Sequence, residues 1–519
     1  MTSDDLVAGV RTVCDVVRGS LGPFGASRLL IQKEGNVTAT ASTRELLERL
    51  DVEDPAVTLL ESTAEGFGDR HGDGTGTVIT LVGALLSEAE RLSELGLHPT
   101  TIERGYRESL ETALDALDRT SRPLSSVGST AVARTAMTGT RDPQVRERVA
   151  DRIAEAVETI GPRARTDLTV FSRTGGAVAE TDLVRGVVTD RGPILDSMPR
   201  SATDGIAVLS DSVDVPHIGS IAGRVSKRVV LETDSFEERR RIADREAEEF
   251  AEILEAAVDA GCRVVITERS VNERVQSALA AHGILGIQRV DEDVLARIAR
   301  ATGARVVPAL AEIDERALGT GTVEVQRKAG RDVTVVSSSA GDPVYTLFSR
   351  APDPRSVTAF EDSLEAAVAA TAAVAEDERV VPGGGAAEAT AARAVEEAAR
   401  SIDDRHQLPA EAFGRALVSV PRALAATAGV DAGRAVIRMR VARTEGRDAI
   451  GVDALAGEVT NVLGEDPIVE PTALKRAILS AATDAAVQLI RIDEQLPAND
   501  LSEEEFDPPE EVDMPAPGS

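Results

Sequence analysis

The chain has 519 residues, of which 88 are acidic and 57 basic, giving a formal net charge of −31, and only four residues are lysine. This length indicates roughly two to four domains, and the negative charge argues against broad nucleic-acid binding, which needs a basic surface. An acidic, lysine-poor surface stays soluble where salt screens its self-repulsion, so we predict a halophilic protein, with an acidic mesophilic one as the alternative.

The first 130 or so residues predict helices separated by short breaks. Apolar residues recur at three- and four-residue spacing over 56–66, 78–96 and 100–117. Pro55 and Pro99 stand where two of these helices begin, and proline is well suited to a first helical turn. The segment DPQVRERVADRIAEAVETIG predicts another amphipathic helix, which ends at Gly161-Pro162.

Strands and helices then alternate to about residue 340. LVRGVVTD, from Leu183, reads as a strand, and 206–209 and 264–266 are short β-branched runs. The segment 235–261, which lies between these two runs, predicts a helix. Its apolar stripe consists of Ala243, Ala247, Phe250, Leu254 and Val258. Its first half, 237–241, is charged nearly all round, so we expect that end to project into solvent.

Helices resume after about residue 341. The final segment NDLSEEEFDPPEEVDMPAPGS is acidic and proline-rich, and we expect it to be disordered. The order of helical, mixed and helical segments favours a middle domain inserted into a helical one. With no apolar run of membrane-spanning length and no basic-then-apolar N-terminal leader, we expect a cytoplasmic protein without a membrane partner.

The cysteines and histidines carry little chemistry. Cys14 and Cys262 lie far apart, without a CxxC spacing, and we expect them to be buried small apolar residues. The five histidines form neither HxxxH nor HExxH, so zinc chemistry is not expected.

The loop GDGTGT, residues 72–77, is a candidate phosphate site. Gly72 and Gly74 let backbone N–H groups approach an anion, Thr75 and Thr77 offer hydroxyls, and the following helix points its positive end at the loop. Asp73 beside a polyphosphate needs a cation between them, and Mg²⁺ fits. The alternative is a plain turn before a helix. Two further glycine-bearing turns, SLGPFG (20–25) and VVPGGGAAE (380–388), support the phosphate interpretation.

Together these segments resemble the group II chaperonins, the thermosome/TRiC family. SLGPFGASRLL is similar to the family's T-L-G-P-x-G-x-x-K-M-L, HGDGTGT to its G-D-G-T-T segment, and VVPGGGAAE to V-V-x-G-G-G-A-x-E. GVDALAGEV and IVEPTALKRAILSAATDAAVQLIRIDE resemble the closing stretches. The match runs in order from the N-terminus to about residue 495.

The resemblance implies a multidomain fold that combines α and α/β parts. A helical equatorial domain binds nucleotide, an intermediate domain acts as a hinge, and an α/β apical domain carries a helical lid protrusion. The expected division is equatorial 1–130, intermediate 131–181, apical 182–340 with the protrusion at 235–261, intermediate 341–386, equatorial 387–498 and a disordered acidic tail 499–519.

The resemblance also implies ATP and Mg²⁺ as cofactors, with Asp73 as the metal ligand. The nucleotide-binding residues carried over by position are Leu21, Gly22, Pro23, Asp73, Gly74, Thr75, Gly76, Thr77, Gly384, Gly385, Asp453 and Glu470. Gly384 and Gly385 would lie against the ribose, Asp453 near the adenine and Glu470 near the ribose hydroxyls.

The sequence departs from the family at the two hydrolytic aspartates, so no catalytic residue is assigned. Ser42 and Ala366 stand at those positions, and neither can orient or deprotonate a water. The adjacent Glu365 and the nearby Asp362 could shift in, but we expect the helical rotation of ~100° per residue to aim such a neighbour elsewhere. Four further replacements accompany them: Ala41 for an asparagine, Thr43 for a glycine, Gly76 for a threonine, and Phe24 for a common lysine.

Two functions remain open. One is a chaperonin subunit of a double ring that binds ATP-Mg and encloses unfolded protein, with hydrolysis weak or lost. The other is an inactive structural or regulatory component that co-assembles with active paralogous subunits. Both imply identical or paralogous subunits in stacked rings as partners, and unfolded proteins as clients in the first case.

Overall fold

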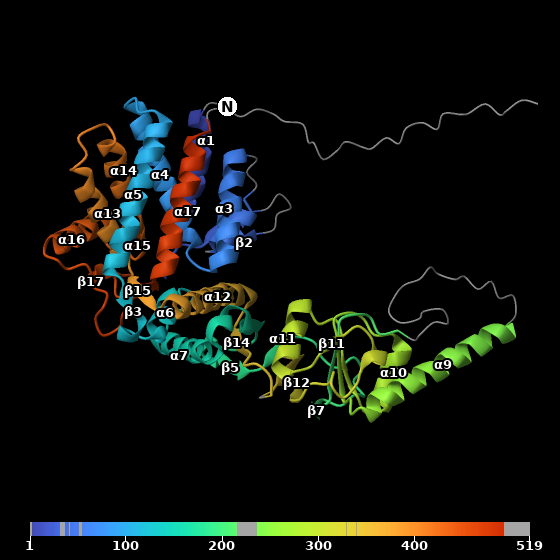
Figure 1. The fold of residues 1–519 in the computed structure, drawn as a ribbon. Coiled ribbons are helices and arrows are strands. Elements are labelled where there is room, and N and C mark those ends of the chain that lie inside the picture. The colour runs from blue at the N-terminus through green and yellow to red at the C-terminus, as the bar shows by residue number, and fades with distance from the viewer. Residues whose placement is uncertain are drawn as a thin grey trace, which may run out of the picture.

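The computed structural model describes residues 3–31, 37–40, 42–50, 54–214, 236–328, 330–338 and 340–492. They form a helical bundle, a smaller layered part beneath it, and an α/β part that extends away from both (Figure 1). Each part has its own large apolar core. The expected tail lies outside the described residues. In the part of the chain that is described, no helix has the length and apolar character needed to cross a membrane.

The bundle is built from both ends of the chain. Its helices are α1 (Ser3–Arg18), α2 (Thr43–Glu48), α3 (Pro55–His71), α4 (Thr75–Glu94), α5 (Pro99–Thr120), α13 (Ala386–Ala399), α14 (Gln407–Leu417), α15 (Ser419–Thr427), α16 (Ala432–Thr444) and α17 (Thr472–Ile490). Helix α17 packs on α4 and α5, and α13 packs on α5 and α14. Small sheets border the bundle: β1 (Arg28–Ile31) with β2 (Val37–Thr40), β16 (Ile450–Asp453) with β17 (Glu458–Asn461), and β15 (Arg379–Pro382) between β18 (Val469–Pro471) and β3 (Arg122–Pro123).

The predicted helix starts in this bundle are confirmed. Pro55 and Pro99 occupy the first turns of α3 and α5, where the missing N–H costs nothing. Asp54 caps α3 by accepting a hydrogen bond from the N–H of Ala56, and His98 caps α5 in the same way from Thr100. The sequence did not predict the β1–β2 hairpin.

The middle part places helices over a three-stranded sheet. Its helices are α6 (Ser129–Ala136), α7 (Pro143–Ile160), α8 (Ala164–Asp167) and α12 (Pro354–Asp377), and its sheet has the order β4 (Leu168–Thr174), β14 (Tyr345–Ala351), β5 (Asp182–Arg185). Ile153, Phe360 and Leu364 are fully buried in its core. Since α12 also contacts α17, this part is joined directly to the bundle.

The α/β part contains two four-stranded sheets. A parallel sheet has the order β10 (Leu285–Ile287), β9 (Val264–Thr267), β8 (Ile206–Leu209), β11 (Val306–Val307), and an antiparallel sheet has the order β6 (Val187–Thr189), β13 (Arg331–Ser337), β12 (Thr322–Lys328), β7 (Ser201–Thr203). Helices α9 (Phe236–Asp259), α10 (Glu273–Ala281) and α11 (Glu292–Thr302) complete it. The runs 206–209 and 264–266 are strands as predicted.

The predicted single strand from Leu183 is wrong in one respect. LVRGVVTD is divided between β5, which pairs with β14, and β6, which pairs with β13 of another sheet. Gly186 lies at the division with φ 139°, and a Cβ there would lie 2.1 Å from the carbonyl oxygen of Val336. The close approach of two backbones at this point requires glycine and ends the first pairing.

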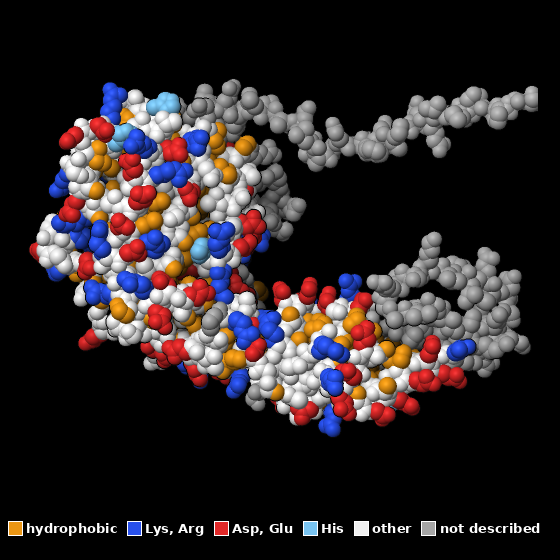
Figure 2. Space-filling model, viewed as in Figure 1, with side chains coloured by type: hydrophobic (Ala, Val, Ile, Leu, Met, Phe, Trp, Pro, Cys, Tyr) orange, Lys and Arg blue, Asp and Glu red, His pale blue; other side chains and the backbone are white. Residues whose placement is uncertain are grey.

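Helix α9 extends beyond the sheets (Figure 1), and Figure 2 shows acidic side chains gathered along it. Its apolar stripe is shorter than predicted, because Ala247 is exposed and burial begins at Phe250 and continues through Leu254. Val258 is half-buried, and Ala257 is buried instead. The side chains of Ala243 and of 237–241 lie outside the described residues.

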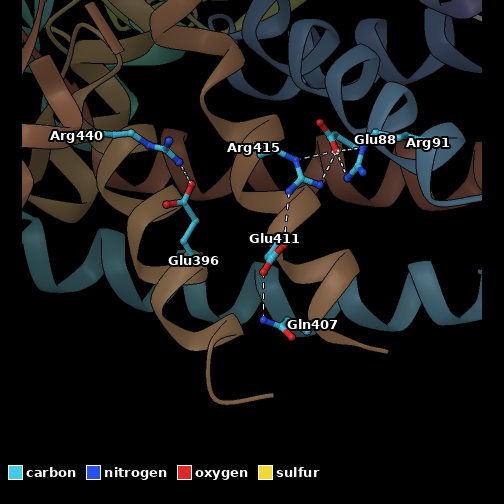
Figure 3. A network of polar contacts seen from close by, with 7 residues as sticks. All are labelled: Glu88, Arg91, Glu396, Gln407, Glu411, Arg415 and Arg440. Atoms are coloured by element: carbon cyan, nitrogen blue, oxygen red, sulfur yellow. Dashed lines mark hydrogen bonds and ion pairs between the residues drawn. The ribbon is translucent and has the colours of Figure 1, made fainter. Parts of the chain in front are cut away.

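A network of polar contacts joins α4 to α14 in the bundle (Figure 3). Glu88 of α4 accepts hydrogen bonds from Arg91 and, at 2.9 Å, from Arg415 of α14. Arg415 also pairs with Glu411 at 3.8 Å. Exposed pairs of this kind contribute about 0–1 kcal/mol each, and salt screens them further. The apolar core therefore supplies most of the bundle's stability.

Both cysteines are buried, as predicted, and burial raises the pKa of each thiol to about 12. At about pH 8 only ~1 in 10⁴ such thiols is the reactive thiolate. We therefore expect no reaction of the native protein with an aromatic disulfide reagent over minutes, and two equivalents of reaction after denaturation. Fast reaction of either cysteine in the native protein would contradict this burial.

Candidate functional site

A cleft of about 1430 Å³ lies between the bundle and the middle part. It brings together the ends of many elements, among them the turn between α3 and α4, the start of α2, and one face of α12. Eleven of the twelve predicted nucleotide-binding residues line it: Leu21, Gly22, Pro23, Asp73, Gly74, Thr75, Gly76, Thr77, Gly384, Asp453 and Glu470.

The turn before α4 is shaped to receive an anion. Gly72 and Gly74 have φ values of 72° and 87°, which glycine adopts without strain. Gly74 is the N-cap of α4 and provides no side-chain cap, so the positive end of this 20-residue helix faces the cleft. Asp73 accepts a hydrogen bond from the N–H of Gly74 at 2.6 Å.

Helix α12 is packed tightly against this turn. A Cβ at Gly72 would lie 2.5 Å from the Cβ of Ala369, so only glycine allows the approach. One turn earlier Ala366 lines the cleft, and the hydroxyl of Ser363 accepts a hydrogen bond from the N–H of Gly139 at 2.8 Å. The middle part therefore forms one wall of the cleft beside this turn.

The other end of the cleft is formed by β15, β16 and β18. Gly384, with φ 61°, lies so close to β16 that a Cβ would be 2.4 Å from the carbonyl oxygen of Val452. Glu470 of β18 is paired in register with Val381 of β15. Gly385 is the one predicted residue that does not line the cleft, because it packs against Pro421 and begins α13.

A buried ion cluster lies close to Asp73 in the turn before α4. The ammonium of Lys475 in α17 contacts the carboxylate of Glu388 and, at 2.7 Å, that of Glu470. Burial lowers the pKa of Lys475, but the two carboxylates outweigh burial and the net pKa is raised. Burial raises the pKa of Glu470, and Lys475 opposes that rise. The ammonium therefore stays charged and fixes Glu470 at the edge of the cleft.

Asp73 lies within the field of the same lysine. Burial raises the pKa of Asp73, while the N–H of Gly74 and the charge of Lys475 lower it. A bound cation would favour the ionised carboxylate further. In the part of the chain that the structure describes, no three His, Cys, Asp or Glu side chains form a metal site. One carboxylate completed by phosphate oxygens and water is a set that suits Mg²⁺, so the residues fit Mg-nucleotide.

The positions of the missing aspartates both face the cleft. Ser42 is the N-cap of α2, and its hydroxyl accepts a hydrogen bond from the N–H of Glu45 at 3.5 Å. Ala366 lies across from it on α12, and both residues line the cleft. Neither side chain can act as a base, so the cleft lacks carboxylates at these two positions.

Our expectation that Asp362 and Glu365 would point elsewhere is wrong, because both line the cleft. Asp362 is four residues before Ala366, and four residues rotate a helix by about 400°, so the two share a face. Burial raises the pKa of Asp362, and a hydrogen bond from Ser42 lowers it. Burial also raises the pKa of Glu365, and Glu361 and Asp362 add to that rise.

The sequence reasoning missed Lys475, Glu388 and Arg141. Arg141 lies 4.4 Å over the ring of Phe24 and donates a hydrogen bond to the carbonyl oxygen of Pro23 at 3.3 Å. It places a cation beside the turn in which Phe24 replaces the family's lysine. The sequence contains one feature that could have indicated Lys475. It is one of only four lysines, and it lies in a helix that is otherwise largely apolar.

Comparison with known proteins identifies the family of the chain. The model of the TCP-1/cpn60 chaperonin family matches residues 13–499. The chain is 31% identical to a thermosome subunit of Methanopyrus kandleri over 509 residues, covering 96% of this chain and 92% of the relative. It is 32% identical to thermosome subunit alpha of Halobacterium salinarum, covering 96% and 89%. It is also 32% identical to thermosome subunit 3 of Haloferax volcanii, covering 95% of each chain.

The match extends over nearly the whole chain, and the mixture of helical bundle and α/β sheets is the one expected for the family. The prediction of a multidomain chaperonin fold is therefore confirmed. The chain belongs to the TCP-1/cpn60 chaperonin family and is a group II chaperonin subunit.

Proposed function

We propose that this subunit binds ATP-Mg in the cleft described above and works in a double ring that encloses unfolded protein, with hydrolysis weak or lost. The observation that carries the proposal is the convergence of eleven predicted nucleotide contacts on one cleft, while both hydrolytic positions, Ser42 and Ala366, lack a carboxylate. The turn before α4 and the first residues of that helix would hold the phosphates. Asp73 would hold Mg²⁺, which would neutralise phosphate charge when bound.

The domain roles follow the same proposal. The bundle would be the equatorial domain, with parts at 1–130 and 387–498. The middle part, 131–181 and 341–386, would be the hinge, and the α/β part, 182–340, would be the apical domain with α9 in its lid. The formal net charge of −31 supports adaptation to high salt, and the protein would work in the cytoplasm.

A second function is favoured by the same two replacements. Because Ser42 and Ala366 provide no carboxylate, the chain would serve as a structural or regulatory component beside active paralogous subunits. In that case it would bind nucleotide without turnover, and rings would need a paralogous partner.

Calorimetric titration with ADP and Mg²⁺, beside phosphate release from ATP, both in molar KCl, tests the two functions. Binding with turnover far below that of an active thermosome subunit supports the proposal. Absence of binding by the folded protein contradicts it. Electron microscopy of the chain alone then separates the functions, since self-assembled rings favour the first and their formation only with a paralogous subunit favours the second.

The β1–β2 hairpin offers a surface for ring assembly. Leu29 and Ile31 are 63% and 71% exposed on β1, and β1 pairs only with β2 in the described sheet. An apolar strand with an open edge is a ready site for pairing with another chain. We expect Leu29→Lys with Ile31→Lys to shift the particle from ring to monomer in light scattering, with unchanged helical content. Arg28→Lys is the matched control, and intact rings in the double variant would exclude this surface.

A further inference from the structure

Position 76 in the phosphate loop has no side chain, although its neighbours Thr75 and Thr77 both carry hydroxyls. The space beside Gly76 is filled from elsewhere in the chain. A Cβ built at Gly76 would lie 3.0 Å from the Oγ1 of Thr43 and 3.2 Å from the Cδ2 of Leu21. The hydroxyl of Thr43 therefore lies where a side chain at position 76 would extend.

Thr43 has the freedom to use this hydroxyl. The N-terminus of α2 is capped by the neighbouring Ser42, whose Oγ accepts from the N–H of Glu45. Among the described residues the Thr43 hydroxyl has no hydrogen-bond partner, it is half-buried, and it lines the cleft with Thr75 and Thr77. A half-buried hydroxyl without a protein partner is a donor available to a ligand.

We infer that Thr43 is a phosphate-binding residue that donates its hydroxyl hydrogen bond to a phosphate oxygen of the bound nucleotide, from the space left open by Gly76. The inference rests on the proposed function, because it requires a nucleotide in this cleft. Thr43 and Gly76 then act as a pair: the hydroxyl comes from α2 because the start of α4 has none at this position. A hydrogen bond to a charged oxygen is stronger than one between neutral groups, so its loss should be measurable.

The test is calorimetric titration of full-length variants with ADP and Mg²⁺ in molar KCl. Thr43→Ala removes the hydroxyl and should weaken binding by about 10-fold or more. Thr43→Ser keeps the hydroxyl and should bind within about twofold of the unmodified chain. Thr43→Ala with Gly76→Thr returns a hydroxyl from the α4 side, and should recover most of the loss. Equal melting temperatures confirm that these variants are folded.

The outcomes separate this inference from the proposed function. Unmodified protein that binds, with Thr43→Ala binding equally well or the double variant showing no recovery, overturns the role of Thr43 and leaves the nucleotide site standing. Folded, unmodified protein that binds no ADP-Mg contradicts both. Weakening by Thr43→Ala, together with retention by Thr43→Ser and recovery by the double variant, supports the inference.

Discussion

Replacement of Lys475 by methionine should lower the free energy of unfolding by about 3–5 kcal/mol, because it leaves the buried carboxylate of Glu388 and the half-buried carboxylate of Glu470 without their partner. Lys475 is almost completely buried, and it contacts both Glu388 and Glu470. One oxygen of Glu388, Oε2, already has no hydrogen-bond partner among the described residues. Urea titration followed by circular dichroism measures the change.

The next residue supplies the matched control. Arg476 pairs with Asp118 at 2.6 Å, but both side chains are partly exposed. Arg476→Met should therefore cost no more than about 1 kcal/mol. Equal losses in the two variants would mean that the buried cluster contributes no more than a surface pair.

The pH dependence of the Lys475→Met variant adds a second readout. Burial already raises the pKa of Glu470 above its ordinary value, and removal of the lysine takes away the charge that opposes the rise. A group whose pKa is higher in the folded than in the unfolded state favours folding more as pH falls. The destabilisation should therefore be larger at about pH 8 than at about pH 5.5. ADP-Mg affinity should fall as well, because Glu470 is held in place at the cleft by this lysine.

Lys475 also marks the limit of what the sequence could predict. Helix starts at Pro55 and Pro99, the glycine turn before α4 and the short strands of the α/β part depend on local preferences, and these were predicted correctly. The cluster around Lys475 depends on three segments, α13, β18 and α17, that meet only in the folded chain. No local sequence pattern predicts that these three segments come into contact.

The same distinction explains the other misses. LVRGVVTD has a strand pattern throughout, but its division between two sheets depends on the carbonyl of Val336, far along the chain. Thr43 and Gly76 looked like two separate departures from a family motif until the fold placed the hydroxyl of one beside the other. Asp362 differs, because its place follows from helix geometry alone: it lies about one full turn before Ala366 and so shares its face of α12.

Restoring both acidic positions, by Ser42→Asp with Ala366→Asp, should raise ATP turnover by at least about 100-fold, since positioned general bases contribute ~10²–10⁴-fold. Both positions line the cleft that contains Asp73 and Thr75, so both new carboxylates would enter it. Phosphate release under saturating ATP measures the change. The control variant Ser42→Asn with Ala366→Asn carries asparagine, which has the shape of aspartate. It should give no gain in turnover, because the amide cannot accept the proton.

A change at Asp362 tests whether this residue opposes the new carboxylates or already acts as the base. It shares a face of α12 with Ala366 and already carries a raised pKa, so a new carboxylate at Ser42 or Ala366 would be repelled by it. In the doubly restored chain, Asp362→Asn should therefore increase turnover further, by removing a like charge. If Asp362→Asn introduced into the otherwise unmodified chain instead abolishes its turnover, Asp362 itself is the base. In that case Asp362, one helical turn before Ala366, replaces the carboxylates that positions 42 and 366 lack.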